Sequence, residues 1–329
     1  MDNKTYTVAV IGAGQLGSRH LQGILKSKLS LKVFVVDPFQ KSLETAESRA
    51  NEIENKHTLQ FHTSISNLPE QLDFGLIASN ADNRAEIIQN LLEHSKVTHL
   101  VLEKVLFQKL EDYKVIGNLL ADHQVKTWVN HPRRSQPIYK ELSARLENES
   151  QIDFSFYGEN WGLACNGLHM LDIISQLSNS PISTISMKNI DSKILESKRA
   201  GNIEITGTLS GKTGNSNTFS VTSSFAEETI RPVSLTINTP EKRFFIQEGM
   251  TCFLIESSLQ NGFKAETTTF PLIFQSDLSD SLVTEILTDG TCDLPSYEEA
   301  KSTHMVFIKE VLDFYNRTTQ KNVNVCPIT

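Results

Sequence analysis

The chain opens with alternating blocks of apolar and amphipathic sequence. Residues 5–11 (TYTVAVI) form a β-branched apolar run, GAGQLG follows at once, and apolar positions then recur at helical spacing through Leu25. A second apolar run, residues 31–36, stops at Asp37, about 20 residues after the glycine motif. This order predicts a strand, a tight turn, a helix and a second strand parallel to the first.

The same alternation continues to about residue 130. Further short apolar runs predict strands, at residues 59–62, 74–78, 99–102 and 126–130. The stretches between them predict helices, such as residues 84–93 and 110–122. Regular alternation of strands with helices is typical of a parallel, doubly wound sheet.

After about Pro137 the pattern changes to longer runs that are rich in Thr and Ser. These runs predict a mostly antiparallel sheet, with strands at residues 203–209, 218–224, 233–238, 244–248 and 265–270. Apolar positions at helical spacing predict two flanking helices, at residues 163–177 and 297–315. The turn-forming segment 211–217 (GKTGNSN) predicts an exposed hairpin loop.

The length of 329 residues is typical of two domains. We therefore expect an α/β protein with an N-terminal Rossmann domain, residues 1–134, and a second α/β domain, residues 135–329. The first would carry the doubly wound parallel sheet and the second the large, mostly antiparallel sheet.

Composition narrows the classes of function. The formal net charge of -8 argues against a nucleic-acid binder, because phosphate-backbone binding needs a clustered basic surface. No apolar run approaches the roughly 18 residues that span a bilayer, and no signal-peptide organisation is visible, so we expect no membrane partner and a cytoplasmic location. The four cysteines are widely scattered without a CxxC pair, so no metal site is expected.

The glycine motif has the spacing of a dinucleotide-binding turn. Gly12 permits the tight turn, Gly14 lets the backbone approach a pyrophosphate, and Gly17 allows the helix to pack on the strand. The following helix offers N–H donors and a favourable dipole at its start. We predict cofactor contacts here and at the neighbouring strand ends, from Gly12, Gly14, Gln15, Leu16, Gly17, Asp37, Ser79, Asn80 and Glu103.

Asp37 favours NAD as the cofactor. Its carboxylate would accept hydrogen bonds from the adenine ribose and would repel the 2'-phosphate of NADP. The next residues, Pro38, Phe39 and Gln40, offer no cation that could hold that phosphate, so NADP is less favoured. The alternative is that Asp37 is only a turn residue before Pro38.

Three further segments resemble the glucose-fructose oxidoreductase and inositol dehydrogenase (Gfo/Idh/MocA) family. LEKV, residues 102–105, resembles the family's Glu-Lys-Pro signature, with Val105 in place of proline. VNHPRRSQP, residues 129–137, resembles its arginine-bearing segment. CNGLHMLD, residues 165–172, resembles a helix that carries aspartate, glycine, histidine and a second aspartate, except that Cys165 replaces the first aspartate.

The resemblance implies an oxidoreductase that moves a hydride between the nicotinamide and a sugar or sugar-derived substrate. Lys104 matches the family's catalytic lysine, and His169 and Asp172 match the histidine and second aspartate. Lysine or histidine with a tuned pKa suits removal of a hydroxyl proton, and Asp172 would orient His169. Two plainer interpretations remain: Lys104 as a surface residue paired with Glu103, and His169 as a packed core histidine. Arg84 stands where the family usually has a histidine.

Substrate contacts are expected from the second and third of these segments and from the tryptophan between them. The residues concerned are Arg133, Arg134, Trp161, Cys165 and Asn166. The arginines favour a charged carbohydrate, such as a nucleotide sugar or an acidic sugar in surface-polysaccharide synthesis. The alternatives are ion pairs for the arginines and core packing for Trp161.

Two other classes of function remain open. One is a non-catalytic NAD-binding regulator, since Cys165 replaces a carboxylate and a fold does not dictate an activity. The other is an NAD-assisted glycosidase or lyase, in which oxidation is transient. In each case the resemblance implies a homodimer or homotetramer, in which the sheets of the second domain pair between subunits.

Overall fold

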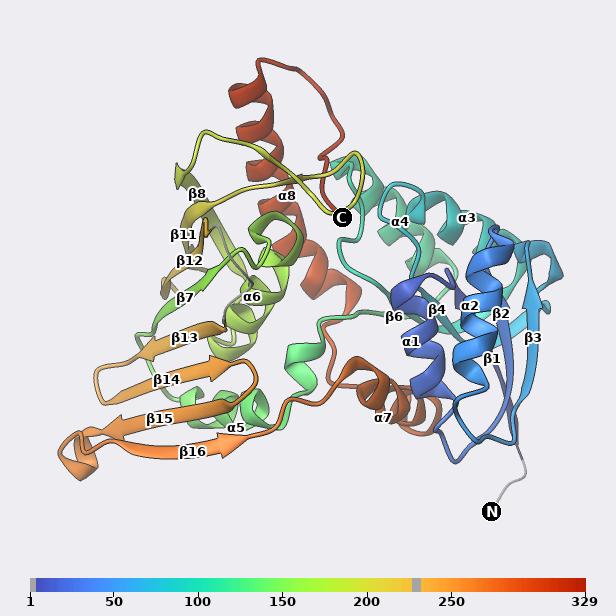
Figure 1. The fold of residues 1–329 in the computed structure, drawn as a ribbon, viewed down its shortest axis with the longest axis horizontal. Helices are drawn as coiled ribbons and strands as arrows, with labels where there is room; N and C mark the ends of the chain where they lie inside the picture. Colours follow the sequence, from blue (N-terminus) through green and yellow to red (C-terminus); the bar gives the residue numbers. More distant parts are fainter. Residues whose placement is uncertain (1–3, 227–231) are drawn as a thin grey trace. The chain divides into compact units, whose positions relative to one another are not determined.

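The computed structural model describes residues 4–226 and 232–329, which form two units (Figure 1). The first unit comprises Met1–Phe107, Glu111–Pro132 and Ile273–Ala300, and the second comprises Gln108–Leu110, Arg133–Leu272 and Lys301–Thr329. The sequence placed all of residues 135–329 in the second domain. The structure differs because residues 273–300 return to the first unit.

The first unit is built on a six-stranded sheet in the order β3-β2-β1-β4-β5-β6. Every neighbouring pair is parallel. The strands are β1 (Thr5–Ile11), β2 (Ser30–Val36), β3 (Thr58–His62), β4 (Gln71–Ile77), β5 (Lys96–Leu102) and β6 (Lys126–Val129). The predicted doubly wound Rossmann sheet is confirmed, and its order reverses between β1 and β4, where such sheets bind ligands beyond the strand ends.

Helices cover this sheet. They are α1 (Gln15–Ile24), α2 (Gln40–Ala50), α3 (Arg84–His94), α4 (Leu110–Asp122) and α7 (Gln275–Asp289). The sequence analysis did not predict α7, which packs along α1 and adds Leu282, Val283 and Ile286 to the core of this unit. The backbones of α1 and α7 approach closely at Gly23, because a Cβ there would lie 2.5 Å from the carbonyl oxygen of Ser276.

The second unit is built on an eight-stranded sheet in the order β16-β15-β14-β13-β7-β12-β11-β8. Its strands are β7 (Asp153–Glu159), β8 (Ile182–Ile190), β11 (Gly207–Thr213), β12 (Thr218–Ser224), β13 (Val233–Asn238), β14 (Lys242–Glu248), β15 (Cys252–Ser258) and β16 (Glu266–Phe270). Of these neighbours, β7 and β12 are parallel and the other pairs are antiparallel. The predicted large, mostly antiparallel sheet is confirmed.

Two local predictions in this sheet were wrong. The strand predicted at residues 203–209 is divided between β10 (Ile203–Glu204), which pairs with β9 (Leu195–Glu196), and β11. The division lies at residues 205–206, directly before Gly207, which begins β11 with a φ of +105°. The loop predicted at residues 211–217 is shorter, because its first three residues belong to β11 and pair with β8.

Helices cover one face of the large sheet. α5 (Pro137–Leu146) and α6 (Leu163–Leu177) pack against each other, and α6 contacts β12 and β8. The last helix, α8 (Tyr297–Thr319), begins in the first unit and continues in the second. Three short 3-10 helices complete the description: η1 (Ile65–Asn67), η2 (Pro132–Ser135) and η3 (Leu259–Asn261).

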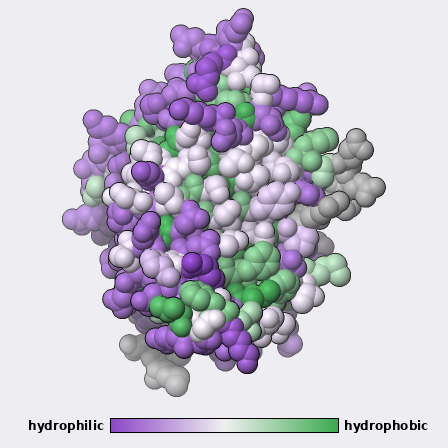
Figure 2. Space-filling model, turned by 90° about the vertical axis from the view of Figure 1, so that its left-hand side faces the viewer, coloured by the Kyte–Doolittle hydropathy of each residue, from purple (hydrophilic) through white to green (hydrophobic). Residues whose placement is uncertain are grey.

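In the described residues, the opposite face of the large sheet carries exposed and half-buried side chains. Phe154 and Phe156 of β7 are buried under the helices, whereas Tyr157 is 45% exposed, as strand alternation requires. Figure 2 shows the side on which the strands of this sheet are drawn in Figure 1. Polar and intermediate residues (purple and white) cover much of this side, and a hydrophobic region (green) lies in its lower part. Phe245 and Phe253 alternate with buried neighbours on adjacent strands, and their rings lie tilted by 35° with centroids 6.0 Å apart.

In the part of the chain that the structure describes, none of the helices combines the length and apolar character that crossing a membrane requires.

Candidate active site and cofactor cavity

The glycine turn between β1 and α1 packs closely against its own backbone and the segment after β4. Gly12 has φ of +94°, and a Cβ there would lie 2.7 Å from the amide nitrogen of Ser79 after β4. A Cβ on Gly17 would lie 1.7 Å from the carbonyl oxygen of Gly12. A Cβ on Gly14 would meet nothing within 4 Å. Two glycines are therefore required for packing, whereas Gly14 leaves the start of α1 open to a ligand.

A cavity of about 850 Å³ lies beyond the carboxyl ends of β1, β2 and β4. Of the predicted cofactor residues, five line it: Gly12, Gly14, Asp37, Ser79 and Asn80. Gln15 lines a neighbouring hollow of about 450 Å³, together with Gly14 and Phe39. Leu16, Gly17 and Glu103 are not among the described residues that line either hollow. The cavity has the size and position that a dinucleotide requires.

The far side of this cavity was not predicted from the sequence. It is formed by the segment after β3 and by one side of α3, with Thr63, Ser64, Ile65, Ser66, Asn83, Glu86, Ile87, Asn90, Glu93 and His94 in the lining. No glycine or charged motif marks these positions. The signal that could have found them is topological, because the ends of β1, β2, β3 and β4 meet at one edge of a parallel sheet.

Asp37 follows β2 and is 7% exposed. One carboxylate oxygen accepts a hydrogen bond from the amide of Ala13 (2.8 Å), and the other accepts one from the amide of Phe39 (2.9 Å). The second bond is the turn-residue role that the sequence left open, while the first fixes the carboxylate against the glycine turn. Asp37 therefore serves the local fold and also lines the cavity.

Gln15 begins α1 and faces the second helix. Its side-chain oxygen accepts a hydrogen bond from Arg49 of α2 (2.7 Å), and its carbonyl oxygen accepts another from Arg49 (3.1 Å). Gly14 as N-cap residue supplies no side-chain cap to the first turn. The amides at the start of α1 are therefore available to an anionic group such as a pyrophosphate.

Lys104 follows β5 and is partly exposed, whereas its neighbours Glu103 and Val105 are buried. Glu103 accepts hydrogen bonds from His20 (2.9 Å) and from the side-chain amide of Asn130 (2.5 Å). Burial would raise the pKa of the Glu103 carboxyl, but the hydrogen bonds from His20 and Asn130 and the charges of His20 and Lys104 together hold that pKa below its usual range. Glu103 is thus an anchored, ionised residue inside the first unit, and its predicted contact with the cofactor stays a prediction.

Arg133 forms an ion pair within the second unit. Its guanidinium donates to both carboxylate oxygens of Glu248, at 2.7–3.2 Å, and Glu248 also accepts a hydrogen bond from Tyr139 (2.6 Å). Burial would raise the pKa of Glu248, but Arg133 and Tyr139 hold it below its usual range. This geometry favours the ion-pair interpretation of Arg133 over substrate binding.

Arg134 is also paired within the second unit. Its Nε donates to both oxygens of Asp172, at 3.0 and 2.9 Å. Asp172 is 3% exposed and lies on α6, one helical turn after His169, which is partly exposed. Residues four or three apart share a helix face, so Cys165, His169 and Asp172 lie on one side of α6.

A carboxylate that the sequence analysis missed lies at the start of α6. Glu204 of β10 accepts hydrogen bonds from the amides of Ala164 (2.9 Å) and Cys165 (3.1 Å). The sulfur of Cys165 lies 3.7 Å from Oγ of Ser197. Negative charge is stabilised at a helix N-terminus, so Glu204 fits this position although it lies far from α6 in the sequence.

Trp161 and Asn166 have local structural partners. Trp161 is 6% exposed, and its indole N–H donates to the carbonyl oxygen of Thr222 (2.9 Å). Asn166 donates through its side-chain amide to the carbonyl oxygen of Trp161 (2.7 Å). Trp161 therefore matches the core-packing alternative.

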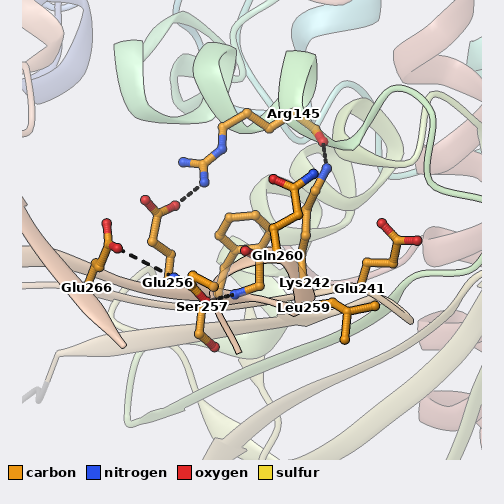
Figure 3. Close-up of a pocket in the computed structure, with 11 residues that line it drawn as sticks. Arg145, Glu241, Lys242, Glu256, Ser257, Leu259, Gln260 and Glu266 are labelled. Carbon is orange, nitrogen blue, oxygen red and sulfur yellow. Dashed lines mark hydrogen bonds and ion pairs between the residues drawn. The ribbon is translucent and has the colours of Figure 1, made fainter. Parts of the chain in front are cut away.

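A second cavity, of about 300 Å³, lies in the second unit beside α5, β14 and β15 (Figure 3). Arg145 pairs there with Glu256. Lys242 pairs with Glu149, which lies outside the described lining, at 2.9 Å. Lys242 also donates to the carbonyl oxygen of Arg145 (2.8 Å). These groups hold α5 to the end of the sheet, so the first cavity remains the candidate for function.

Comparison with protein families identifies the first unit. Residues 6–131 match the Gfo/Idh/MocA model, which is described as an oxidoreductase family with an NAD-binding Rossmann fold. The resemblance predicted from the sequence is confirmed over this part of the chain. No protein with a curated function matches the sequence.

Solved structures share the fold over nearly the whole chain. A putative NADPH-dependent oxidoreductase from Desulfitobacterium hafniense is 14% identical, with a TM-score of 0.72 and coverage of 98% of this chain and 97% of its own. The transcriptional regulator Gal80p from Kluyveromyces lactis is 13% identical, with a TM-score of 0.72 and coverage of 98% and 92%. The UDP-N-acetylglucosamine 3-dehydrogenase from Acidithiobacillus ferrooxidans is 13% identical, with a TM-score of 0.66 and coverage of 93% and 97%. At these identities the comparison supports the fold alone.

Proposed function

We propose that this protein is an NAD-dependent oxidoreductase that transfers a hydride between the nicotinamide and a sugar or sugar-derived substrate. The observation that carries the proposal is the cavity at the reversal point of the parallel sheet, which Gly12, Gly14 and Asp37 line together. Its glycine turn has an open helix start at Gly14, where a Cβ would meet no atom. The match of residues 6–131 to an NAD-binding oxidoreductase family supports the same chemistry.

NAD is the proposed cofactor. Gly14 and the first amides of α1 would hold the pyrophosphate, and Asp37 would accept hydrogen bonds from the adenine ribose. The Asp37 carboxylate is already fixed by the amides of Ala13 and Phe39, so it costs little to order on binding. When bound, NAD supplies the hydride acceptor.

The protein's own residues move the protons. Lys104, on the segment after β5, would take the hydroxyl proton of the substrate while the hydride leaves its carbon, and His169 would share this acid–base work. Glu103 fixes the backbone before Lys104 through His20 and Asn130. Both carboxylate oxygens of Asp172 accept a hydrogen bond from Nε of Arg134, and we propose that this ion pair orients the face of α6 that carries His169.

The proposed substrate class is a nucleotide sugar or an acidic sugar, and the proposed setting is the cytoplasmic synthesis of a surface polysaccharide. The UDP-N-acetylglucosamine 3-dehydrogenase with the same fold supports a nucleotide sugar. The arginines support it less than the sequence suggested, because Glu248 and Asp172 already neutralise Arg133 and Arg134.

A second candidate is a regulator that binds NAD without turnover. Two departures from the family's catalytic motifs favour it, Val105 for proline and Cys165 for aspartate. Gal80p, a transcriptional regulator, has the same fold over 98% of this chain. Turnover with any sugar substrate decides between the two candidates.

The cofactor assignment is tested by calorimetric titration with NAD and NADP. Wild-type protein should bind NAD more tightly than NADP, and Asp37→Ser should lose most of that preference, because it removes the charge that repels a 2'-phosphate. Asp122→Ser removes an exposed carboxylate of α4 that lies outside the described lining of both hollows, so it is the matched control and should leave the preference unchanged. Equal or tighter binding of NADP by the wild type would remove Asp37 from the ribose site.

A further inference from the structure

Arg84 is the first residue of α3 and is 1% exposed. Its guanidinium donates to three backbone carbonyl oxygens in the first unit: those of Val105, of Leu106 (3.0 Å) and of Ser79. Ser79 belongs to the loop after β4 and lines the cofactor cavity. Val105 directly follows Lys104. One buried side chain therefore joins the cavity loop to the segment that carries the lysine.

Arginine is suited to this bridge in a way that other cations are not. Its planar guanidinium carries five N–H donors in a fixed fork, so a single group reaches carbonyls on two segments. A lysine is a point donor, and a neutral histidine has one N–H. Carbonyl groups buried at strand ends need partners, and bonds from a charged donor are stronger than those between neutral groups.

The segment is fixed on the other side of Lys104 as well. Glu103 accepts hydrogen bonds from His20 and Asn130, and its own amide donates to the carbonyl oxygen of Ile77 (3.0 Å). Buried polar contacts thus hold both chain neighbours of Lys104, while Lys104 itself is partly exposed. Through Glu103 the segment is held to His20 of α1 and to Asn130, the residue after β6. Through Arg84 it is held to Ser79, which lines the cavity.

We propose that Arg84 is a positioning residue that couples cofactor binding at the Ser79 loop to the placement of Lys104. The inference rests on the proposed function, since it takes Ser79 as part of the cofactor site and Lys104 as the acid–base group. A ligand that fixes the Ser79 carbonyl fixes the guanidinium, which in turn fixes the carbonyls of Val105 and Leu106. The position is one at which this chain departs from its family, where a histidine is usual.

The experiment measures the acylation rate of Lys104 by an amine-reactive ester, followed by peptide mass spectrometry on the full-length protein, with and without NAD. Coupling between sites typically amounts to about 5–150-fold. We expect NAD to slow acylation of Lys104 by at least about fivefold in the wild type, and by less than about twofold in Arg84→Met. Arg84→Lys, which keeps the charge but reaches fewer carbonyls, should give an intermediate value. Calorimetry on the same variants reports NAD affinity.

Tyr297→Phe is the matched control. It removes another buried hydrogen bond to a carbonyl of the first unit, that of Tyr113 (2.7 Å), without touching the segment at Lys104. It should lower the melting temperature and keep the full NAD effect on Lys104. If Arg84→Met does not fold, the effect of NAD on Lys104 acylation in Arg84→Lys tests the coupling by itself.

The outcomes distinguish a failure of the proposed function from a failure of the coupling through Arg84. A wild type that does not bind NAD overturns the proposed function. A wild type that binds NAD, combined with Arg84 variants that keep its full effect on Lys104, overturns the coupling and leaves the proposed function standing. Binding of NAD that does not change Lys104 acylation in the wild type also overturns the coupling.

Discussion

Gly14 and Gly17 lie three residues apart in one motif, and the structure gives them opposite roles. A Cβ on Gly17 would overlap the carbonyl oxygen of Gly12 at 1.7 Å, and this backbone atom cannot rotate away. Overpacking typically costs about 1–3 kcal/mol and sometimes more, so we expect Gly17→Ala to cost about 3 kcal/mol or more. At about 2–4 °C per kcal/mol, the melting temperature should fall by about 6 °C or more.

Gly14→Ala should behave in the opposite way. Gly14 has φ of -63°, outside the left-handed region that favours glycine, and its Cβ would enter open space. The substitution reduces the entropy of the unfolded chain and should stabilise the apoprotein by about 0.4–1 kcal/mol. The same Cβ blocks the approach of a pyrophosphate, and each lost hydrogen bond to a charged group is worth about 1.5–3 kcal/mol, so NAD affinity should fall about tenfold or more.

Calorimetric unfolding of the apoproteins and titration with NAD measure both effects. The pair of variants matters because a general loss of stability cannot raise the melting temperature of Gly14→Ala while weakening its NAD binding. Wild-type NAD affinity in Gly14→Ala would refute the placement of the pyrophosphate. An unchanged melting temperature in Gly17→Ala would refute the packing argument.

Four further predictions concern the proton chemistry, the thiol, the buried ion pair and the assembly. Lys104→Met and His169→Ala should each lower turnover by about a hundred- to ten-thousand-fold while leaving NAD affinity nearly unchanged, and steady-state kinetics with calorimetry checks both values. Cys165→Ala should lose only modest activity; a loss beyond about a hundredfold, or roughly 2.7 kcal/mol of barrier, at unchanged melting temperature would make the thiol a catalytic group. The pKa of Glu248 is lowered in the folded protein, so its contribution to the free energy of unfolding is present above its ordinary pKa of 4.5 and is lost as the pH falls through the folded value. In Arg133→Met this loss of stability at acid pH should shrink or reverse. Denaturant unfolding between about pH 6 and pH 3 measures it. The face of the large sheet opposite its helices should pair with a second copy, so light scattering should give a dimer or tetramer, and a monodisperse species of 36.9 kDa at micromolar concentration would refute that.

The first unit was largely predictable because its signals are local. The glycine motif, the apolar runs and the position of Asp37 each lie within one strand–turn–helix unit, and the structure places them as expected. Helix α7 was not predictable in this way. Its sequence follows the second domain, and its assignment to the first unit depends on contacts with α1 that lie about 250 residues away in the chain, such as the bond between His20 and Ser279 (2.8 Å, 259 residues apart).

The partners of charged side chains were the least predictable part of the site. Arg133 and Arg134 look alike in the sequence, yet one pairs with Glu248, 115 residues later, and the other with Asp172, 38 residues later. Periodicity carries no information on such pairs. His20 is the exception, since a polar residue on the apolar side of a predicted helix indicates a buried partner, here Glu103.

The central claim is that the protein exchanges hydride between NAD and a sugar-derived substrate. It is tested most directly by following NADH absorbance when the purified protein is offered NAD with nucleotide sugars and sugar acids, and NADH with the corresponding keto sugars. The account predicts a substrate-dependent change in NADH for at least one member of the panel, abolished by Lys104→Met. A protein that binds NAD but exchanges hydride with no member of the panel in either direction would contradict the account and favour the regulator.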